Sequence, residues 1–304
     1  MPALTRRGIL IYNRGDFMIC NLCPRRCGAV RGEFDGEGYC QLGTLPKIAR
    51  IAPHYWEEPC ISGTKGSGAV FFSGCTLRCV FCQNYEISAL KKGRYISPAE
   101  LAEEIKKLEA EGVHNINLVS PTPYVEAIIE TFEIYKPNIP IVYNCSGYEN
   151  IKTLKRLEGI VDIYLPDFKY SDDALALRLS GAKNYVQTAL EAIGEMLRQT
   201  ESAEYDENGM MTRGAIIRHL VLPNHTKNSI DALKLLADNF GSPLVSLMCQ
   251  YIPFGKAREI PELNRKVTKR EYEKVKNALF GLELDGYAQD LSSADEKYVP
   301  KWEV

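Results

Sequence analysis

Three cysteines lie within eleven consecutive residues of this chain, Gly74-Cys75-Thr76-Leu77-Arg78-Cys79-Val80-Phe81-Cys82-Gln83-Asn84. An iron-sulfur cube normally takes four cysteine ligands, so the three thiolates of this C-x3-C-x2-C spacing would leave one iron open. The backbone amides between the cysteines are positioned to donate hydrogen bonds to the sulfides. Core cysteines or a zinc knuckle are the alternatives, but zinc usually needs a fourth nearby ligand and no histidine follows. We therefore expect a cube whose open iron takes another ligand.

The composition is typical of a cytoplasmic enzyme. The chain has 304 residues, of which 45% are hydrophobic and 25% charged, and a formal net charge of -2. This length is sufficient for one large core. The near-neutral balance argues against nucleic acid as a partner, and the short apolar run at 9–12 is too brief for a signal peptide or a spanning helix. Ten cysteines without a secretory signal indicate metal ligation more than disulfides.

A second cysteine group precedes the first. Cys20, Cys23, Cys27 and Cys40 have the spacing C-x2-C-x3-C-x12-C, with several glycines between them that favour turns. Four thiolates form a closed site, which fits either a structural zinc ion or an auxiliary 4Fe-4S cluster. The sequence does not separate the two. We expect this segment to support the protein and not to act as a second catalytic centre.

Apolar runs alternate with amphipathic stretches from Gly68 onward, which predicts repeated β-α units around a parallel sheet. The expected strands cover residues 68–73, 115–120, 139–143, 161–165, 215–222 and 244–251. Capping boxes at Ser97 to Glu100 and Thr268 to Glu271 mark the starts of two helices. Right-handed crossovers would make every strand parallel and gather the strand-to-helix loops at one mouth. Six units, not eight, predict a partial (βα)6 TIM-like barrel with a lateral gap.

This reading divides the chain into three parts. Residues 1–62 form an N-terminal cysteine-rich metal-binding segment, 63–260 the partial barrel, and 261–304 a C-terminal helix and tail packed on the barrel. In the fifth strand, Arg218 and His219 must face opposite ways. We expect Arg218 to point inward, because its guanidinium suits a carboxylate. Among the histidines, His54, His114 and His225 form no metal-like pair, and we expect them in structural or solvent-exposed positions.

The C-x3-C-x-aromatic-C spacing resembles the signature of the radical S-adenosylmethionine (SAM) superfamily. A narrower resemblance, to the PflX-type homologues of pyruvate formate-lyase activating enzyme, covers nearly the whole chain. It rests on the cysteine loop and three further segments, Cys20-Asn21-Leu22-Cys23-Pro24-Arg25-Arg26-Cys27, His54 with Glu57-Glu58-Pro59-Cys60-Ile61-Ser62, and Pro166-Asp167-Phe168-Lys169.

The resemblance implies a 4Fe-4S cluster held by Cys75, Cys79 and Cys82, whose open iron is chelated by the amino and carboxylate groups of SAM. An electron from the reduced cluster would break the sulfonium, releasing methionine and a 5'-deoxyadenosyl radical. It also implies a SAM pocket that includes Phe81, a segment at Asn144 and Ser146 similar to the Asp-Thr-Asn-Gly of glycyl-radical-enzyme activases, and Asp167 and Lys169 in place of their Asp-Leu-Lys. Ser120 and Thr122 stand where many relatives have Gly-Gly-Glu.

Three functions remain open at this stage. The first is an activase that removes a hydrogen atom from a glycine of a partner glycyl-radical enzyme, with reduced flavodoxin or ferredoxin as electron donor. The second is a radical SAM enzyme that modifies a peptide, a protein side chain or a small molecule. The third is a non-catalytic iron-sulfur or zinc protein for binding or electron transfer. No residue is identified as catalytic.

Overall fold

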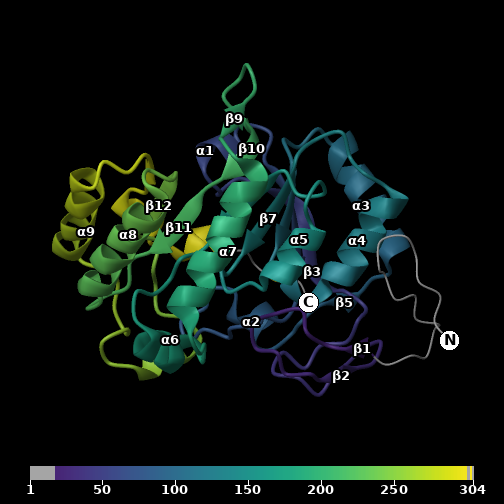
Figure 1. Cartoon of the computed structure of the whole chain (residues 1–304), viewed down its shortest axis with the longest axis horizontal. Helices are drawn as coiled ribbons and strands as arrows, with labels where there is room; N and C mark the ends of the chain where they lie inside the picture. Colours follow the sequence, from purple (N-terminus) through teal and green to yellow (C-terminus); the bar gives the residue numbers. More distant parts are fainter. Residues whose placement is uncertain (1–17, 300–301, 303–304) are drawn as a thin grey trace.

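A curved sheet of parallel strands forms the centre of the molecule in the computed structural model, which describes residues 18–299 and 302 (Figure 1). The parallel strands are, in spatial order, β4 (Ser67–Phe72), β6 (Ile116–Val119), β7 (Ile141–Cys145), β8 (Ile163–Pro166), β10 (Met211–Ala215) with β11 (Ile217–Leu220), β12 (Val245–Met248) and β13 (Gly286–Ala288). Each strand pairs with the next, and a bridge from Asp167 to Arg218 links β8 to β11. The predicted α/β fold with six β-α units is confirmed.

The expectation that every strand is parallel is wrong at the edges of the sheet. Strand β3 (Lys47–His54) pairs antiparallel with β4, and β5 (Arg94–Tyr95) pairs antiparallel with β3. Strand β9 (Glu204–Tyr205) forms an antiparallel pair with β10. Antiparallel neighbours need no helical crossover, and the connections from β3 to β4 and from β9 to β10 contain no long helix. β13 adds a parallel strand that the sequence pattern did not reveal.

Two strand boundaries differ from the prediction for identifiable reasons. The third strand starts at Ile141 and not at Ile139, because Pro140 lacks the backbone N–H that the ladder requires. The strand ends at Cys145, so Asn144 lies within it. The fifth strand is interrupted at Ile216, whose N–H donates to the Tyr164 carbonyl while its neighbours form β10 and β11.

Helices cover the outer face of the sheet (Figure 1). They are α3 (Pro98–Ala110), α4 (Val125–Ile134), α5 (Ile151–Arg156), α6 (Asp173–Ser180), α7 (Tyr185–Thr200), α8 (Thr226–Phe240) and α9 (Lys269–Gly281). Both predicted capping boxes are present, Ser97 with Glu100 and Thr268 with Glu271. Within the described residues, no helix combines the length and apolar character that crossing a membrane requires.

Short elements complete the chain. They are the strand pair β1 (Met18–Ile19) and β2 (Val30–Arg31), the helices α1 (Pro59–Ser62) and α2 (Tyr85–Ser88), and the 3-10 turns η1 (Thr122–Tyr124), η2 (Gly255–Glu259), η3 (Leu291–Ser293) and η4 (Glu296–Tyr298). Figure 1 shows the segment with β1 and β2 along the same side of the molecule as α2 and α6, which follow strands β4 and β8. The division at residues 62 and 260 stays a prediction. β3 pairs with β4 across the first boundary, and β13 pairs with β12 across the second.

His219 lies outside the barrel mouth, as the alternation of faces in β11 predicts. Its imidazole is fully buried, and Nδ1–H donates to the Phe168 carbonyl at 2.6 Å. Burial, with a smaller contribution from the Lys169 charge, lowers the pKa of His219 to about 4. The side chain is therefore neutral in the folded protein at neutral pH.

This burial predicts a pH-dependent contribution to stability. An unfolded histidine titrates near pH 6.5, so the unfolded chain takes up a proton first as the pH falls. The contribution is complete above about pH 6.5 and is lost as the pH falls toward 4, by about 3 kcal/mol in total. Replacement His219→Gln should remove this dependence, as measured by urea unfolding from pH 7 to 4. An equal fall in the free energy of unfolding from pH 7 to 4 in the two proteins would show that His219 is not its source.

Candidate functional site

Three cysteine thiols face one cavity at the carboxyl ends of the parallel strands. Cys75, Cys79 and Cys82 follow β4 and line a cavity of about 390 Å³. The loop begins with Gly74 at a φ of +89°, where a Cβ would lie 2.3 Å from the Leu42 side chain. This position therefore requires glycine, and it packs the cysteine loop against the N-terminal segment.

Hydrogen-bond donors surround the three sulfurs. The Leu77 N–H donates to Cys75 Sγ at 3.3 Å, Ser180 Oγ to Cys79 Sγ at 2.8 Å, and Ser88 Oγ to Cys82 Sγ at 3.2 Å. Burial, followed by the neighbouring Cys79 and Cys75, raises the pKa of Cys82 to about 12. Three thiolates at this position therefore require a bound cation. The donors and the shared cavity fit an iron-sulfur cluster held by these residues.

Arg218 is the centre of a charged network on the wall of the same cavity. It donates from Nη1 to Glu57 Oε2 at 2.9 Å, from Nε to Asp167 Oδ1 at 3.2 Å, and from Nη2 to Asn144 Oδ1. Lys169 pairs with the second oxygen of Asp167. Burial alone would raise the pKa of Asp167, but the charges of Lys169 and Arg218 hold it below its usual range. Two carboxylates and two cations thus balance within the cavity wall.

Glu57 accepts further hydrogen bonds from two amides. Asn117 Nδ2 donates to Glu57 Oε1 at 3.1 Å and Asn144 Nδ2 donates to the same atom at 3.2 Å. The loops after β7 and β8 approach closely, because a Cβ at Gly147, whose φ is +73°, would lie 2.3 Å from the Asp167 carbonyl oxygen. These contacts fix the polar side chains of four segments around one space.

Most of the sequence-predicted pocket residues line this cavity. With the three cysteines these are Ser120, Asn144, Ser146, Asp167, Lys169 and Arg218. Two others do not line it. Phe81 is buried with its ring centroid 6.3 Å from that of Tyr251, and Thr122 Oγ1 donates to Glu149 at 2.9 Å. The binding roles of all eight residues stay predictions.

Sequence reasoning missed the contributions of two segments that lie outside the six β-α units. His54, Trp56 and Glu57 come from β3 and the loop after it, and Gln289, Ser293 and Tyr298 come from the region after β13. His54 was expected in an ordinary structural or surface position. The available signal was the polar and aromatic run His54-Tyr55-Trp56-Glu57, but neither helical nor strand periodicity marks it.

The N-terminal cysteine segment is hydrogen-bonded directly to the loop that carries Cys75, Cys79 and Cys82. Arg25, between Cys23 and Cys27, donates to the carbonyl oxygens of Thr76, Leu77, Ser180 and Gly181. Its guanidinium carbon lies 3.5 Å from the centroid of the Tyr39 ring, and Tyr39 Oη donates to the Leu77 carbonyl at 3.0 Å. The first cysteine group therefore braces the second through one arginine.

Arg31 attaches the same segment to the barrel. It is buried and donates to the carbonyl oxygens of Leu42 at 2.9 Å and Pro123 at 2.7 Å, and also to Gly43. Cys20 and Cys23 are buried, whereas Cys27 is exposed. Burial raises the pKa of Cys23 to about 12, and nearby Cys20 and Cys40 add to this.

A second metal site at these four cysteines stays a prediction. Among the residues that the structure describes, no group of three or more His, Cys, Asp or Glu side chains is spaced to share a single metal ion.

The sequence model of the radical SAM superfamily matches residues 69–236, from β4 to α8. This chain therefore belongs to the radical SAM superfamily. Membership implies an enzyme that uses a 4Fe-4S cluster and SAM, and the cavity lined by Cys75, Cys79 and Cys82 contains the residues that fit them.

The chain is also similar to individual known proteins. The uncharacterized protein MJ0674 of Methanocaldococcus jannaschii is 32% identical over 269 residues, which cover 85% of this chain and 73% of the relative. A methylornithine synthase (PylB) structure is 18% identical, with a TM-score of 0.49, over 72% of this chain and 66% of that chain. Streptococcus suis SuiB bound to S-adenosylmethionine is 15% identical, with a TM-score of 0.48, over 73% of this chain and half (50%) of SuiB.

The Arg25 contacts predict a specific effect on the cysteine loop. Replacement Arg25→Lys keeps the charge but loses the fork that reaches four carbonyls. We expect the free energy of unfolding to fall by about 2 kcal/mol, and the reconstituted protein to retain less iron. The control is Arg26→Lys at the exposed neighbouring position, expected to change stability by less than about 0.5 kcal/mol. Equal iron retention and stability in the two variants would argue against a bracing role.

Proposed function

We propose that this protein is a PflX-type activating enzyme that generates a glycyl radical on a partner protein. The observation that carries the proposal is the assembly of Asn144, Asp167 and Lys169 around the cavity of the three cysteines. These residues belong to the two segments that resemble glycyl-radical-enzyme activases. A bound cluster and SAM would supply a 5'-deoxyadenosyl radical, with one electron from reduced flavodoxin or ferredoxin in the cytoplasm.

The chain's own residues have the properties needed to hold a zwitterionic ligand. Arg218 uses three of its five N–H groups on Glu57, Asp167 and Asn144, and its side chain stays 11% exposed. The remaining N–H groups suit a carboxylate of the ligand. Glu57, whose side chain is 10% exposed, has an oxygen that suits an ammonium group. These two residues would orient the amino acid portion of SAM beside the cysteines.

The partner supplies the reacting hydrogen in this proposal. The glycine C–H bond would break, its hydrogen atom would become part of 5'-deoxyadenosine, and the unpaired electron would stay on the glycine. One electron from the reductant and one SAM are consumed for each radical made. The four N-terminal cysteines, as a zinc or auxiliary 4Fe-4S site, would support the cysteine loop through Arg25.

The proposal is tested by deuterium transfer. The protein is loaded anaerobically with iron and sulfide, reduced, and mixed with SAM and a glycyl-radical enzyme labelled with deuterated glycine. We expect deuterium in 5'-deoxyadenosine by mass spectrometry and a glycyl radical by EPR. Replacement Cys79→Ala should reduce both to background, because one ligand is lost. Replacement Cys249→Ala, at a buried cysteine outside the cavity, should leave both signals.

The possible outcomes separate the candidate functions. Unlabelled 5'-deoxyadenosine with a fully loaded cluster would contradict the activase and favour an enzyme that modifies another peptide, side chain or small molecule. The N-terminal cysteine group, which the simplest activases lack, supports this second candidate. Absence of 5'-deoxyadenosine with all candidate substrates would contradict radical chemistry itself.

The metal of the N-terminal group is tested by elemental analysis. Replacing Cys20, Cys23, Cys27 and Cys40 together by alanine should remove either about four irons or about one zinc per chain. Loss of iron would identify an auxiliary cluster and loss of zinc a structural site. An unchanged metal content would show that these cysteines hold neither. The variant with only Cys249→Ala is the matched control for cysteine removal.

A further inference from the structure

The C-terminal segment spans the lateral gap of the partial barrel. We call residues 289–299 together with Trp302 the tail. The tail starts after β13, beside β12 on one side of the gap, and Trp302 reaches Phe71 of β4 on the other side. Gln289, Ser293 and Tyr298 line the cavity that contains the three cysteine thiols. The gap in the sheet is therefore covered by the chain itself.

Two aromatic contacts hold the far end of the tail. Tyr298 packs against Trp56 with ring centroids 4.7 Å apart and an interplanar angle of 71°. Trp302 packs against Phe71 with centroids 5.2 Å apart at 72°. Both are edge-to-face arrangements, which are favourable for aromatic pairs. Trp56 and Phe71 both line the cavity, so the tail is seated on its rim.

The seat of Trp302 is an apolar patch of the barrel mouth. Trp302 packs against a buried cluster that extends from β3 across β4 to β6, formed by Ala49, Ala69, Phe71, Ile87 and Val119. The patch and Trp56 together give two apolar positions beside a polar cavity. Apolar positions beside polar groups suit an extended polypeptide, because its side chains can fill the apolar positions while its backbone forms hydrogen bonds.

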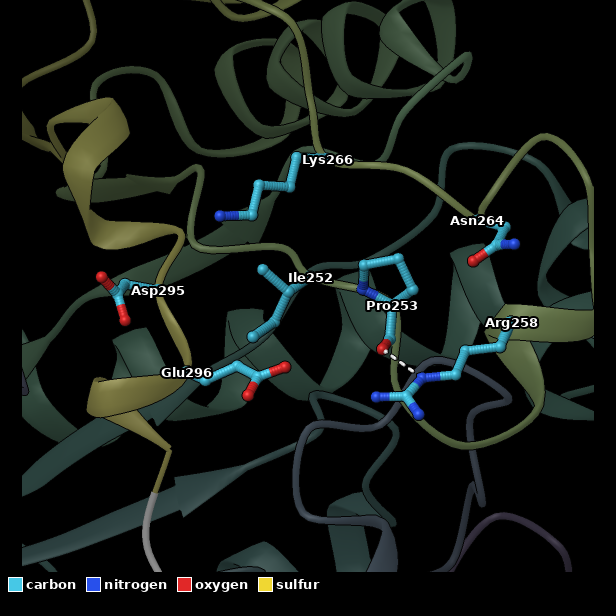
Figure 2. A pocket seen from close by; sticks show the side chains of 7 residues that line it. All are labelled: Ile252, Pro253, Arg258, Asn264, Lys266, Asp295 and Glu296. Carbon is cyan, nitrogen blue, oxygen red and sulfur yellow. Dashed lines mark hydrogen bonds between the residues drawn. The ribbon is translucent and has the colours of Figure 1, made fainter.

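Elsewhere the tail buries few side chains, although Lys266 Nζ donates to the Ala294 carbonyl. Between Asp290 and Val299, Ala294 is the single buried residue. The caps of η3 and η4 are local, because Asp290 and Asp295 accept from the N–H groups of Ser292 and Lys297. A second hollow, of about 530 Å³, lies between Asp295 and Glu296 of the tail and the side chains of Arg258 and Asn264. Figure 2 shows these residues around it. One flank of the tail is thus open, which favours local detachment.

The cavity beneath the tail has the size of a small-molecule site and not of a protein segment. Its volume of about 390 Å³ is at the low end of the range for small-molecule sites. Strand ends and the cysteine loop, which Arg25 fixes to the N-terminal segment, form other walls of this cavity. A macromolecular substrate that approaches through the lateral gap therefore meets the tail before it reaches the thiols.

We propose that the lateral gap is the docking groove for an extended segment of a protein substrate, and that the tail occupies this groove until the substrate displaces it. This inference rests on the proposed function for the nature of the substrate. It assigns Trp56 and Phe71 as the seats for apolar side chains of the incoming segment. The occupant in the resting protein is the chain's own tail.

The experiment measures binding of a synthetic peptide with the sequence of residues 290–304. A fluorescein label on the peptide reports binding by anisotropy to the full-length, reconstituted protein with and without SAM. The double variant Tyr298→Ala with Trp302→Ala loses both aromatic contacts of its own tail. We expect it to bind the peptide at least about tenfold more tightly than the unaltered protein, whose tail competes.

Matched variants separate the seats from general effects. The double variant Tyr298→Phe with Trp302→Phe keeps an aromatic ring at each seat and should bind the peptide as weakly as the unaltered protein. Phe280→Ala removes an exposed aromatic ring from α9, outside the groove, and should also match the unaltered protein. Adding Trp56→Ala to the alanine double variant should abolish the gain in affinity.

Three results would overturn the inference. They are equal peptide affinity in the alanine double variant and the unaltered protein, equal binding of a scrambled peptide, and a dimer that the alanine variant converts to a monomer. The last would identify the tail of a second copy as the occupant. Peptide binding requires no turnover. A failure of the radical assay with normal peptide binding would therefore refute the proposed function and leave the groove intact.

Discussion

The guanidinium of Arg218 joins parts of the chain that are distant in sequence. It binds Glu57 after the antiparallel strand β3, Asn144 in β7, and Asp167 after β8. The charges are nearly buried, so each depends on the others for compensation. Removing the arginine would leave two carboxylates facing one another with Lys169 alone to neutralise them. The shape of the cavity wall is therefore set by one balanced group of charges.

A second constraint acts on the cysteine loop from the opposite side. Arg25 donates to two backbone carbonyls of the loop, those of Thr76 and Leu77. The same side chain reaches Ser180 and Gly181 at the end of α6. The loop is thus held between an N-terminal segment and a helix of the barrel. A support of this kind fixes the backbone of the loop that carries the three thiols.

Local patterns were enough to predict the central strands and several helix starts. Ser97 with Glu100 and Thr268 with Glu271 are capping signals that depend on four neighbouring residues. The two-residue period of a strand required Arg218 and His219 to face opposite ways, and the fit of a guanidinium to a carboxylate selected Arg218 as the inward residue. Pro140 moved one strand boundary because a missing N–H counts for more than an apolar run.

The features that were missed depend on contacts across the chain. β3 has no regular alternation of buried and exposed residues, and β13 is only three residues long. Glu57 gains its position from Asn117, Asn144 and Arg218, none of which is near it in sequence. Trp302 and Phe71, whose rings pack together, are likewise distant in sequence. Sequence patterns locate elements, whereas pairings between distant side chains complete the site.

The position of the tail in the chain has a consequence for biosynthesis. Synthesis proceeds from the N-terminus, so all seven cysteines of the two groups leave the ribosome before residue 289 is made. β3, β4 and the six β-α units also precede it. The seam of the barrel therefore stays open while the nascent chain folds, and an assembly factor has access to the thiols during this interval. Synthesis of the tail then covers the opening beside the cysteine thiols.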